Sequence, residues 1–171
     1  MWPELLRALA LVKQAAAQTN QELGELDPGK ATLIVAACQE IANGALHDQF
    51  VVDQIQGGAG TSTNMNANEV IANRALEIAG RPRGDYAFLH PIEHVNMGQS
   101  TNDVYPTSLR VALRFATAEL WKAMEELKQS FAAKSMEFEN LLKIGRTQLQ
   151  DAVPMTHGPA FSTFAVRLGE S

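Results

Sequence analysis

The sequence predicts an all-α fold, and three observations support this prediction. Long stretches place apolar residues three and four positions apart, which is the spacing of one helix face. Aromatic residues make up only 6% of the 171 residues although 46% are hydrophobic, so helices are expected to pack closely through small side chains such as alanine. Polar segments rich in glycine and proline separate these stretches, as expected for loops that join helices.

Four helices are expected, over residues 3–18, 28–44, 64–79 and 105–143. Asp27 and Pro28 are typical of a helix start, because Asp accepts hydrogen bonds from the first N–H groups and Pro fits the first helical position. Gly44 and Gly80 are suited to end the second and third helices. The sequence therefore predicts an N-terminal helical domain over residues 1–104.

The last predicted helix is too long for a small domain. At 1.5 Å per residue, a helix of about 35 residues would extend over about 50 Å, and Pro106 opens the pattern without a later Gly or Pro to interrupt it before about residue 143. A second helical pattern begins at Phe161 and is still running at Ser171. We therefore expect residues 105–171 to be the truncated start of a central helical bundle that other chains complete. Self-association or poor solubility is expected because apolar residues along the long helix need partners, among them Leu113, Leu120, Leu127 and Phe131.

Composition argues against several classes of protein. The net charge is −5 and the isoelectric point is near 5.3, and no Lys/Arg cluster forms a stripe, so nucleic acid and anionic membrane are excluded as partners. The single cysteine, Cys38, is expected in the core, and together with the absence of a signal peptide it indicates a reducing, cytoplasmic compartment. His47, His90 and His94 do not have the spacing of metal ligands, so no metal site is expected.

Three polar segments suggest one binding site. Residues 61–64 and 100–103 each place Ser, Thr and Asn at the start of a helix, where free N–H groups and a partial positive charge bind anions. Capping is the ordinary role of such residues, but four in a row after the glycine-rich segment 57–60 exceed what one cap requires. Residues 144–159 form the third segment, which we expect to be a loop after a helix. Together the segments indicate a site for a small, anionic, hydrogen-bonding molecule.

The same segments resemble three motifs of the aspartase/fumarase superfamily, in the right order along the chain. They read GGAGTSTNMNANEV from residue 57, HVNMGQSTNDVYPT from residue 94 and GRTQLQDAVPMT from residue 145. Within the superfamily they are more similar to aspartate ammonia-lyases than to class II fumarases. Fumarases more often carry Gly-Thr-Gln-Ser-Asn at the first motif, and they have His-Pro-Asn-Asp where this chain has His90-Pro91-Ile92-Glu93. Fumarases, and some aspartases, have His at the position of Gln148. A class II fumarate hydratase remains the alternative.

The resemblance implies a reaction and a set of site residues. Aspartases eliminate ammonia from L-aspartate to give fumarate without an organic cofactor, and family members are homotetramers whose active sites combine motifs from three subunits. The reaction passes through an aci-carboxylate, which positioned hydrogen-bond donors must stabilise. By resemblance, the carboxylate is bound by Thr61, Ser100 and Thr101, and the departing amino group faces Asn102, Thr147 and Gln148.

Two departures from the family pattern bear on activity. The mobile Gly-Ser-Ser loop that carries the family's catalytic base is absent from residues 1–171, so no catalytic residue is identified and the chain is expected to be an inactive N-terminal fragment. The family usually has Leu-Gly-Gln-Glu at residues 157–160, where this chain has His-Gly-Pro-Ala. A third alternative is a catalytically dead helical assembly module.

Overall fold

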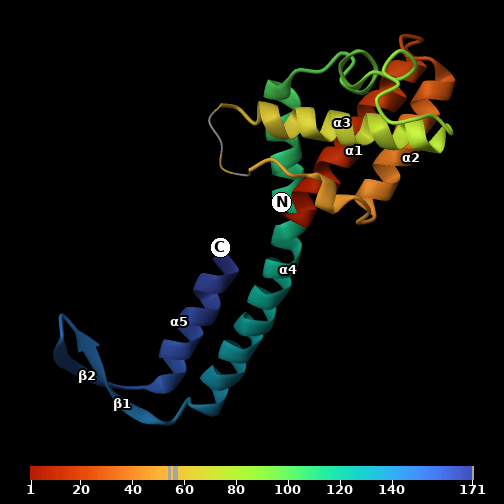
Figure 1. Cartoon of the computed structure of the whole chain (residues 1–171). Coiled ribbons are helices and arrows are strands. Elements are labelled where there is room, and N and C mark those ends of the chain that lie inside the picture. The colour runs from red at the N-terminus through yellow and green to blue at the C-terminus, as the bar shows by residue number, and fades with distance from the viewer. Residues whose placement is uncertain (54, 56–57, 171) are drawn as a thin grey trace. The chain divides into compact units, whose positions relative to one another are not determined.

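The computed structural model describes residues 1–53, 55 and 58–170; Gly57 of the first motif and the final Ser171 lie outside them. The described residues form two compact units, 1–115 and 116–171, which divide inside one long helix (Figure 1). The all-α prediction is confirmed, with one two-stranded hairpin added. Among the helices described, none is long and apolar enough to cross a bilayer. The domain boundary between residues 104 and 105 stays a prediction.

The first unit is built on three helices, α1 (Pro3–Glu22), α2 (Pro28–Ala42) and α3 (Thr61–Ile78). Helix α2 packs against both α1 and α3 (Figure 1). The unit also contains the 3₁₀ turn η1 (His47–Gln49), the π-helical turn η2 (Pro91–Val95), which packs on α3, and the first part of α4 (Thr101–Glu137). Its core is aliphatic, as the composition predicts, and includes Leu6, Leu9, Ile34, Cys38, Ile41, Ile71, Leu76 and Leu89.

Two helix starts lie earlier than the sequence predicts. Helix α3 begins at Thr61 instead of residue 64, because Gly60 adopts a left-handed conformation that turns the chain directly into the helix. Helix α4 begins at Thr101 instead of residue 105, so Pro106 lies inside the helix and does not open it. The polar residues before each predicted start are therefore part of the first helical turn.

The prediction of a helix up to residue 143 is wrong for its last part. Helix α4 ends at Glu137, and a hairpin of β1 (Leu142–Thr147) and β2 (Gln150–Thr156) follows, before α5 (His157–Glu170). The predicted loop over 144–159 is therefore mostly a hairpin. No Gly or Pro marks the end of α4 in the sequence, and the residues at this end pack against the start of α5, where the Gly158 N–H donates to the Phe138 carbonyl over 3.1 Å.

The packing at the end of α4 depends on Gly158. A Cβ atom at Gly158 would lie 2.9 Å from Glu139 Cα and 3.0 Å from the Ser135 carbonyl oxygen. The Ser135 hydroxyl also donates to the Gly158 carbonyl over 2.8 Å. Gly158, which the family pattern shares, is thus closely packed against the end of α4, next to the positions that depart from that pattern.

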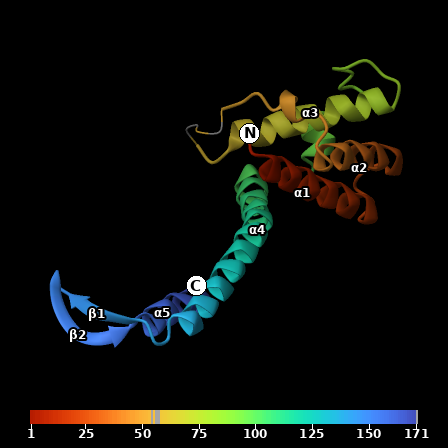
Figure 2. The same ribbon diagram turned by 90° about the horizontal axis from the view of Figure 1, so that it is seen from below.

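In the second unit, α5 lies alongside the adjoining part of α4 (Figure 2). Aromatic rings join the two helices, with Phe131 5.3 Å from Phe164 and Phe138 5.4 Å from Phe161 between ring centroids. The packing between α4 and α5 still leaves apolar side chains exposed, among them Leu120, Trp121, Leu127 and Met136.

The N-cap of α2 provides a test of the fold. Asp27 Oδ1 accepts a hydrogen bond from the Lys30 backbone N–H over 3.0 Å. We expect Asp27→Ala to lower the free energy of unfolding by about 1 kcal/mol, because one N–H group of the first turn loses its partner. Asp27→Asn keeps the acceptor and should lose much less. Urea unfolding of the 171-residue chain measures both, and equal losses would contradict the role of the cap.

Candidate active site

The first part of the candidate site is the start of α3. Gly60 is the N-cap of this helix with φ of +82° and has no side chain to cap the first N–H groups. Its carbonyl oxygen accepts from the Asn64 N–H over 3.0 Å. Thr61 and Ser62, in the first turn, are exposed. This helix end therefore presents backbone donors and hydroxyl groups to solvent, the combination that binds an anion.

The second part is the start of α4. The Ser100 hydroxyl oxygen accepts from the Asn102 backbone N–H over 3.2 Å, so Ser100 acts as a cap and keeps its own hydrogen for donation. Thr101 is half-buried and Asn102 is exposed. Pro106 has no N–H to donate to the Asn102 carbonyl, four residues earlier, so this oxygen lacks its usual helical partner.

The two helix starts meet. Asn64 Nδ2, on α3, donates to Thr101 Oγ1, on α4, over 2.9 Å. A Cβ atom at Gly60 would lie 2.4 Å from the Tyr105 ring, so the α3 start is in direct contact with the first turns of α4. The structure therefore brings together the parts of α3 and α4 that carry four of the six predicted residues: Thr61, Ser100, Thr101 and Asn102.

A buried polar network lies behind this junction. Asn96 Oδ1 accepts from Lys13 Nζ over 2.7 Å and from Asn64 and Asn68 Nδ2 over 3.2 Å each. Lys13, Asn64 and Asn68 are almost completely buried. Burial lowers the pKa of Lys13 to about 7. The network is thus an extended set of amides with one buried amine, and Asn64 joins it to Thr101.

Reasoning from the sequence did not identify Lys13, Asn64 or Asn96 as site residues. Asn64 and Asn96 lie within the recognised motifs, and their amides could have been candidates. Lys13 carries a subtler signal, since it follows Leu6 and Leu9 on the buried face of α1 at helical spacing. A lysine on such a face is normally assigned to solvent, because lysine is almost never fully buried.

The last two predicted residues belong to the second unit. Thr147 ends β1 and pairs with Gln150, and Gln148 and Leu149 form the two-residue turn between the strands. Gln148 has φ of +48° and Leu149 has φ of +62°. Most residues other than Gly and Asn are strained at such values. Thr147 and Gln148 are exposed at this tip. A polar side chain held in a strained turn is typical of a functional position.

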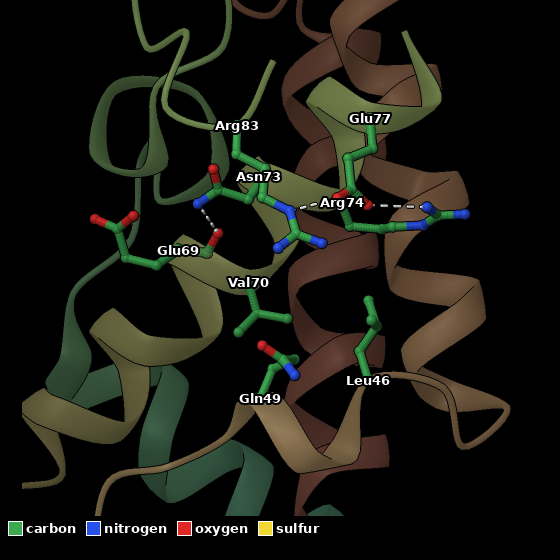
Figure 3. Close-up of a pocket in the computed structure, with 8 residues that line it drawn as sticks. All are labelled: Leu46, Gln49, Glu69, Val70, Asn73, Arg74, Glu77 and Arg83. Atoms are coloured by element: carbon green, nitrogen blue, oxygen red, sulfur yellow. Dashed lines mark hydrogen bonds and ion pairs between the residues drawn. The ribbon is translucent and has the colours of Figure 1, made fainter. Parts of the chain in front are cut away.

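A pocket elsewhere in the first unit contains none of the six predicted residues. It has a volume of about 260 Å³ and is lined by Leu46, Gln49, Glu69, Val70, Asn73, Arg74, Glu77 and Arg83 (Figure 3). Arg74 binds both carboxylate oxygens of Glu40, with Nε 2.6 Å from Oε2, and also contacts Glu77, which pairs with Arg83. These pairs lower the pKa of the Glu40 and Glu77 carboxyls. Since the charges satisfy one another, this pocket is a structural ion-pair network between α2 and α3.

No metal site is built by the described residues. Among residues 1–53, 55 and 58–170, no three His, Cys, Asp or Glu side chains converge as metal ligands. His94 Nε2 lies 2.9 Å from Lys30 Nζ, and burial together with this cation lowers the pKa of His94.

Comparisons with known proteins agree on a family. A family model described as lyase matches residues 1–171. The chain is 57% identical to aspartate ammonia-lyase of Pseudomonas aeruginosa over 99% of its own length and 36% of that protein. It is 59% identical in sequence to fumarate lyase:delta crystallin from Brucella melitensis, a protein of known structure. The two structures match with a TM-score of 0.92, over 98% of this chain and 39% of that one.

A fumarase gives a weaker sequence match. The class II fumarase of Schistosoma mansoni is 38% identical, with a TM-score of 0.92, over 99% of this chain and 36% of that one. The backbone is therefore shared between the two enzyme types, while the sequence is nearer to the ammonia-lyase. The chain spans 36% of the length of the curated ammonia-lyase that it matches.

The contact between Gly60 and Tyr105 can be tested by substitution. We expect Gly60→Ala to lower the free energy of unfolding by about 2 kcal/mol or more, because the added methyl group is strained at positive φ and collides with the ring. Gly58→Ala is the matched control, since Gly58 also has a positive φ, of +97°, but open space around it. Thermal and urea unfolding compare the two, and equal losses would show that the Tyr105 contact is unimportant.

Proposed function

Because this chain belongs to the lyase family, within the aspartase/fumarase superfamily, we propose that it supplies substrate-binding residues of an aspartate ammonia-lyase. The reaction converts L-aspartate to fumarate and ammonia. The chain is 57% identical in sequence to the Pseudomonas aeruginosa ammonia-lyase, against 38% to the Schistosoma mansoni fumarase. The observation that carries the proposal is the junction of two helix starts, where Asn64 contacts the Thr101 hydroxyl oxygen.

The difficult step is removal of a proton from C3 of aspartate. This carbon is not acidic, so the neighbouring carboxylate must take up the charge as an aci-carboxylate with two negative oxygens. Hydroxyl groups of Thr61, Ser100 and Thr101, with the first N–H groups of α3, would donate to these oxygens. Such donors suit the task because they stabilise added negative charge without titrating, and the helix end is already oriented before the charge develops.

The departing amino group needs acceptors and polar partners. The Asn102 carbonyl, which Pro106 leaves without its helical donor, would accept a hydrogen bond from the ammonium group. The side chains of Asn102, Thr147 and Gln148 would surround the same group. By analogy with the family, Thr147 and Gln148 reach this site from another subunit of a homotetramer.

Assembly of the proposed tetramer has a physical basis in α4. Its side chains Leu120, Trp121 and Leu127 are exposed, with Trp121 at 72%, and a second copy of the helix would bury them. The base that removes the C3 proton would come from the part of the parent enzyme outside the matched third of the relatives. No organic cofactor is required, and the free, buried Cys38 fits a reducing cytoplasm.

The proposed activity can be tested with a chimera. Residues 1–171 would replace the matching segment of the Pseudomonas aeruginosa aspartate ammonia-lyase, and ammonia release from aspartate would be compared with hydration of fumarate. We expect ammonia release by the chimera and none by the 171-residue chain alone, because the chain binds carboxylate but has no identified base. Hydration of fumarate by the chimera would favour the fumarase alternative. Turnover by the chain alone would contradict the assignment of the base.

Thr101→Val in the chimera tests the assigned donor. The substitution keeps the shape of the side chain and removes its hydroxyl, so kcat/KM should fall by about 10²–10³, as in oxyanion holes that lose one donor. Thr107→Val, at an exposed position further along α4, is the control and should change kcat/KM by less than about twofold. A folded Thr101→Val chimera with parental kcat/KM would remove Thr101 from the site.

A further inference from the structure

Lys13 is an unusual core residue. Its side chain has 0% exposure, and among the described residues no carboxylate forms an ion pair with it. Cys38, on α2, interacts with it electrostatically, but burial raises the pKa of that thiol to about 12, so Cys38 stays neutral and supplies no counter-charge. A lysine amine buried without a counter-ion is destabilising compared with an apolar side chain of similar size, because either the charge is buried or the proton is given up. Stability alone therefore does not explain a lysine at this position.

The hydrogen bond of Lys13 fixes the orientation of the Asn96 amide. Lys13 Nζ donates to Asn96 Oδ1 over 2.7 Å, so the Asn96 amide is oriented with its oxygen toward the amine. The other end of the amide agrees, because Asn96 Nδ2 donates to the Gln99 carbonyl over 3.0 Å. The Asn96 oxygen is therefore fixed as an acceptor within the network.

The orientation of Asn96 determines that of Asn64. Because Asn96 presents an oxygen, Asn64 must present its Nδ2, and the two atoms lie 3.2 Å apart. The same Nδ2 donates its second hydrogen to Thr101 Oγ1 over 2.9 Å. Thr101 thus accepts from the protein interior, and its own hydrogen is directed to another acceptor. A reversed Asn64 amide would instead draw the Thr101 hydrogen inward.

We infer that Lys13 is a positioning residue for the proposed lyase reaction, acting through Asn96 and Asn64 to hold the Thr101 hydroxyl as a donor to the substrate carboxylate. The inference rests on the proposed function for the role of Thr101, while the amide network itself does not. Asn68 provides a matched comparison. Its Nδ2 also donates to Asn96 Oδ1 over 3.2 Å, but no hydrogen bond joins it to Thr101.

A double-mutant cycle in the chimera tests the inference. Lys13→Met should lower kcat/KM about tenfold when Thr101 is present, the change that follows from one misdirected hydrogen bond. In the Thr101→Val background the same substitution should change kcat/KM less than about twofold, because the group on which it acts is gone. The effect of Asn64→Leu on kcat/KM should likewise depend on whether Thr101 is present, and the effect of Asn68→Leu should not. Equal losses in both backgrounds would show that Lys13 is merely structural and would overturn the inference.

A second experiment does not depend on activity. Nuclear magnetic resonance of the 171-residue chain can follow the side-chain NH₂ signals of Asn96 and Asn64, with Asn20, whose Nδ2 donates to the Met97 carbonyl over 2.9 Å, as the reference outside the network. Lys13→Met should move the Asn96 and Asn64 signals and leave that of Asn20 in place. Unchanged Asn64 signals would overturn the inference even in an active chimera. An inactive chimera with the expected shifts would instead count against the proposed function alone.

A conservative variant keeps the inference testable if the Lys13→Met protein does not fold. Lys13→Gln keeps an uncharged donor of similar length, so it should retain kcat/KM within about threefold and keep the Asn64 signal in place. A tenfold loss of kcat/KM in Lys13→Gln with an unmoved Asn64 signal would also overturn the inference.

Discussion

The candidate site depends on the close approach of Gly60 to the ring of Tyr105. A side chain at residue 60 would occupy the space of that ring, and the backbone there has a left-handed conformation that glycine adopts readily. This approach places the start of α3 beside the start of α4. The positive ends of two helix dipoles then lie together, with the hydroxyl groups of their first turns in the same region. Without the contact, each helix start would be an ordinary exposed terminus.

The interior of the first unit supports this junction with polar as well as apolar packing. The core is rich in alanine and small aliphatic side chains, which bring helices close together but provide little shape specificity. Hydrogen bonds among Lys13, Asn96 and Asn64 add directional constraints that aliphatic contacts cannot supply. Since Lys13 lies on α1, the first helix contributes to the geometry of Thr101 although it carries none of the predicted binding residues.

Much of the fold could be predicted because its signals are local. The apolar spacing and the Asp27 cap predicted helix α2 from its observed start to two residues beyond its observed end, and four of the six residues predicted to bind substrate meet at the starts of α3 and α4. The errors arose where distant contacts decide the structure. The end of α4 packs against Gly158 of α5, and no Gly or Pro near Glu137 indicates this end in the sequence. The role proposed for Lys13 depends on three other segments, so periodicity alone could not reveal it.

The turn at the hairpin tip has a consequence for attempts to make this protein more robust. Two-residue hairpin turns in this conformation are most favourable with Asn-Gly, whereas this chain has Gln148 and Leu149. Turn redesign or selection for heat resistance would therefore tend to replace both residues and gain stability. The same replacements would remove the side chain proposed to face the amino group of the substrate. Thermostability and turnover should thus be in opposition at this turn, so a stabilised variant of the parent enzyme is better sought by changing other loops.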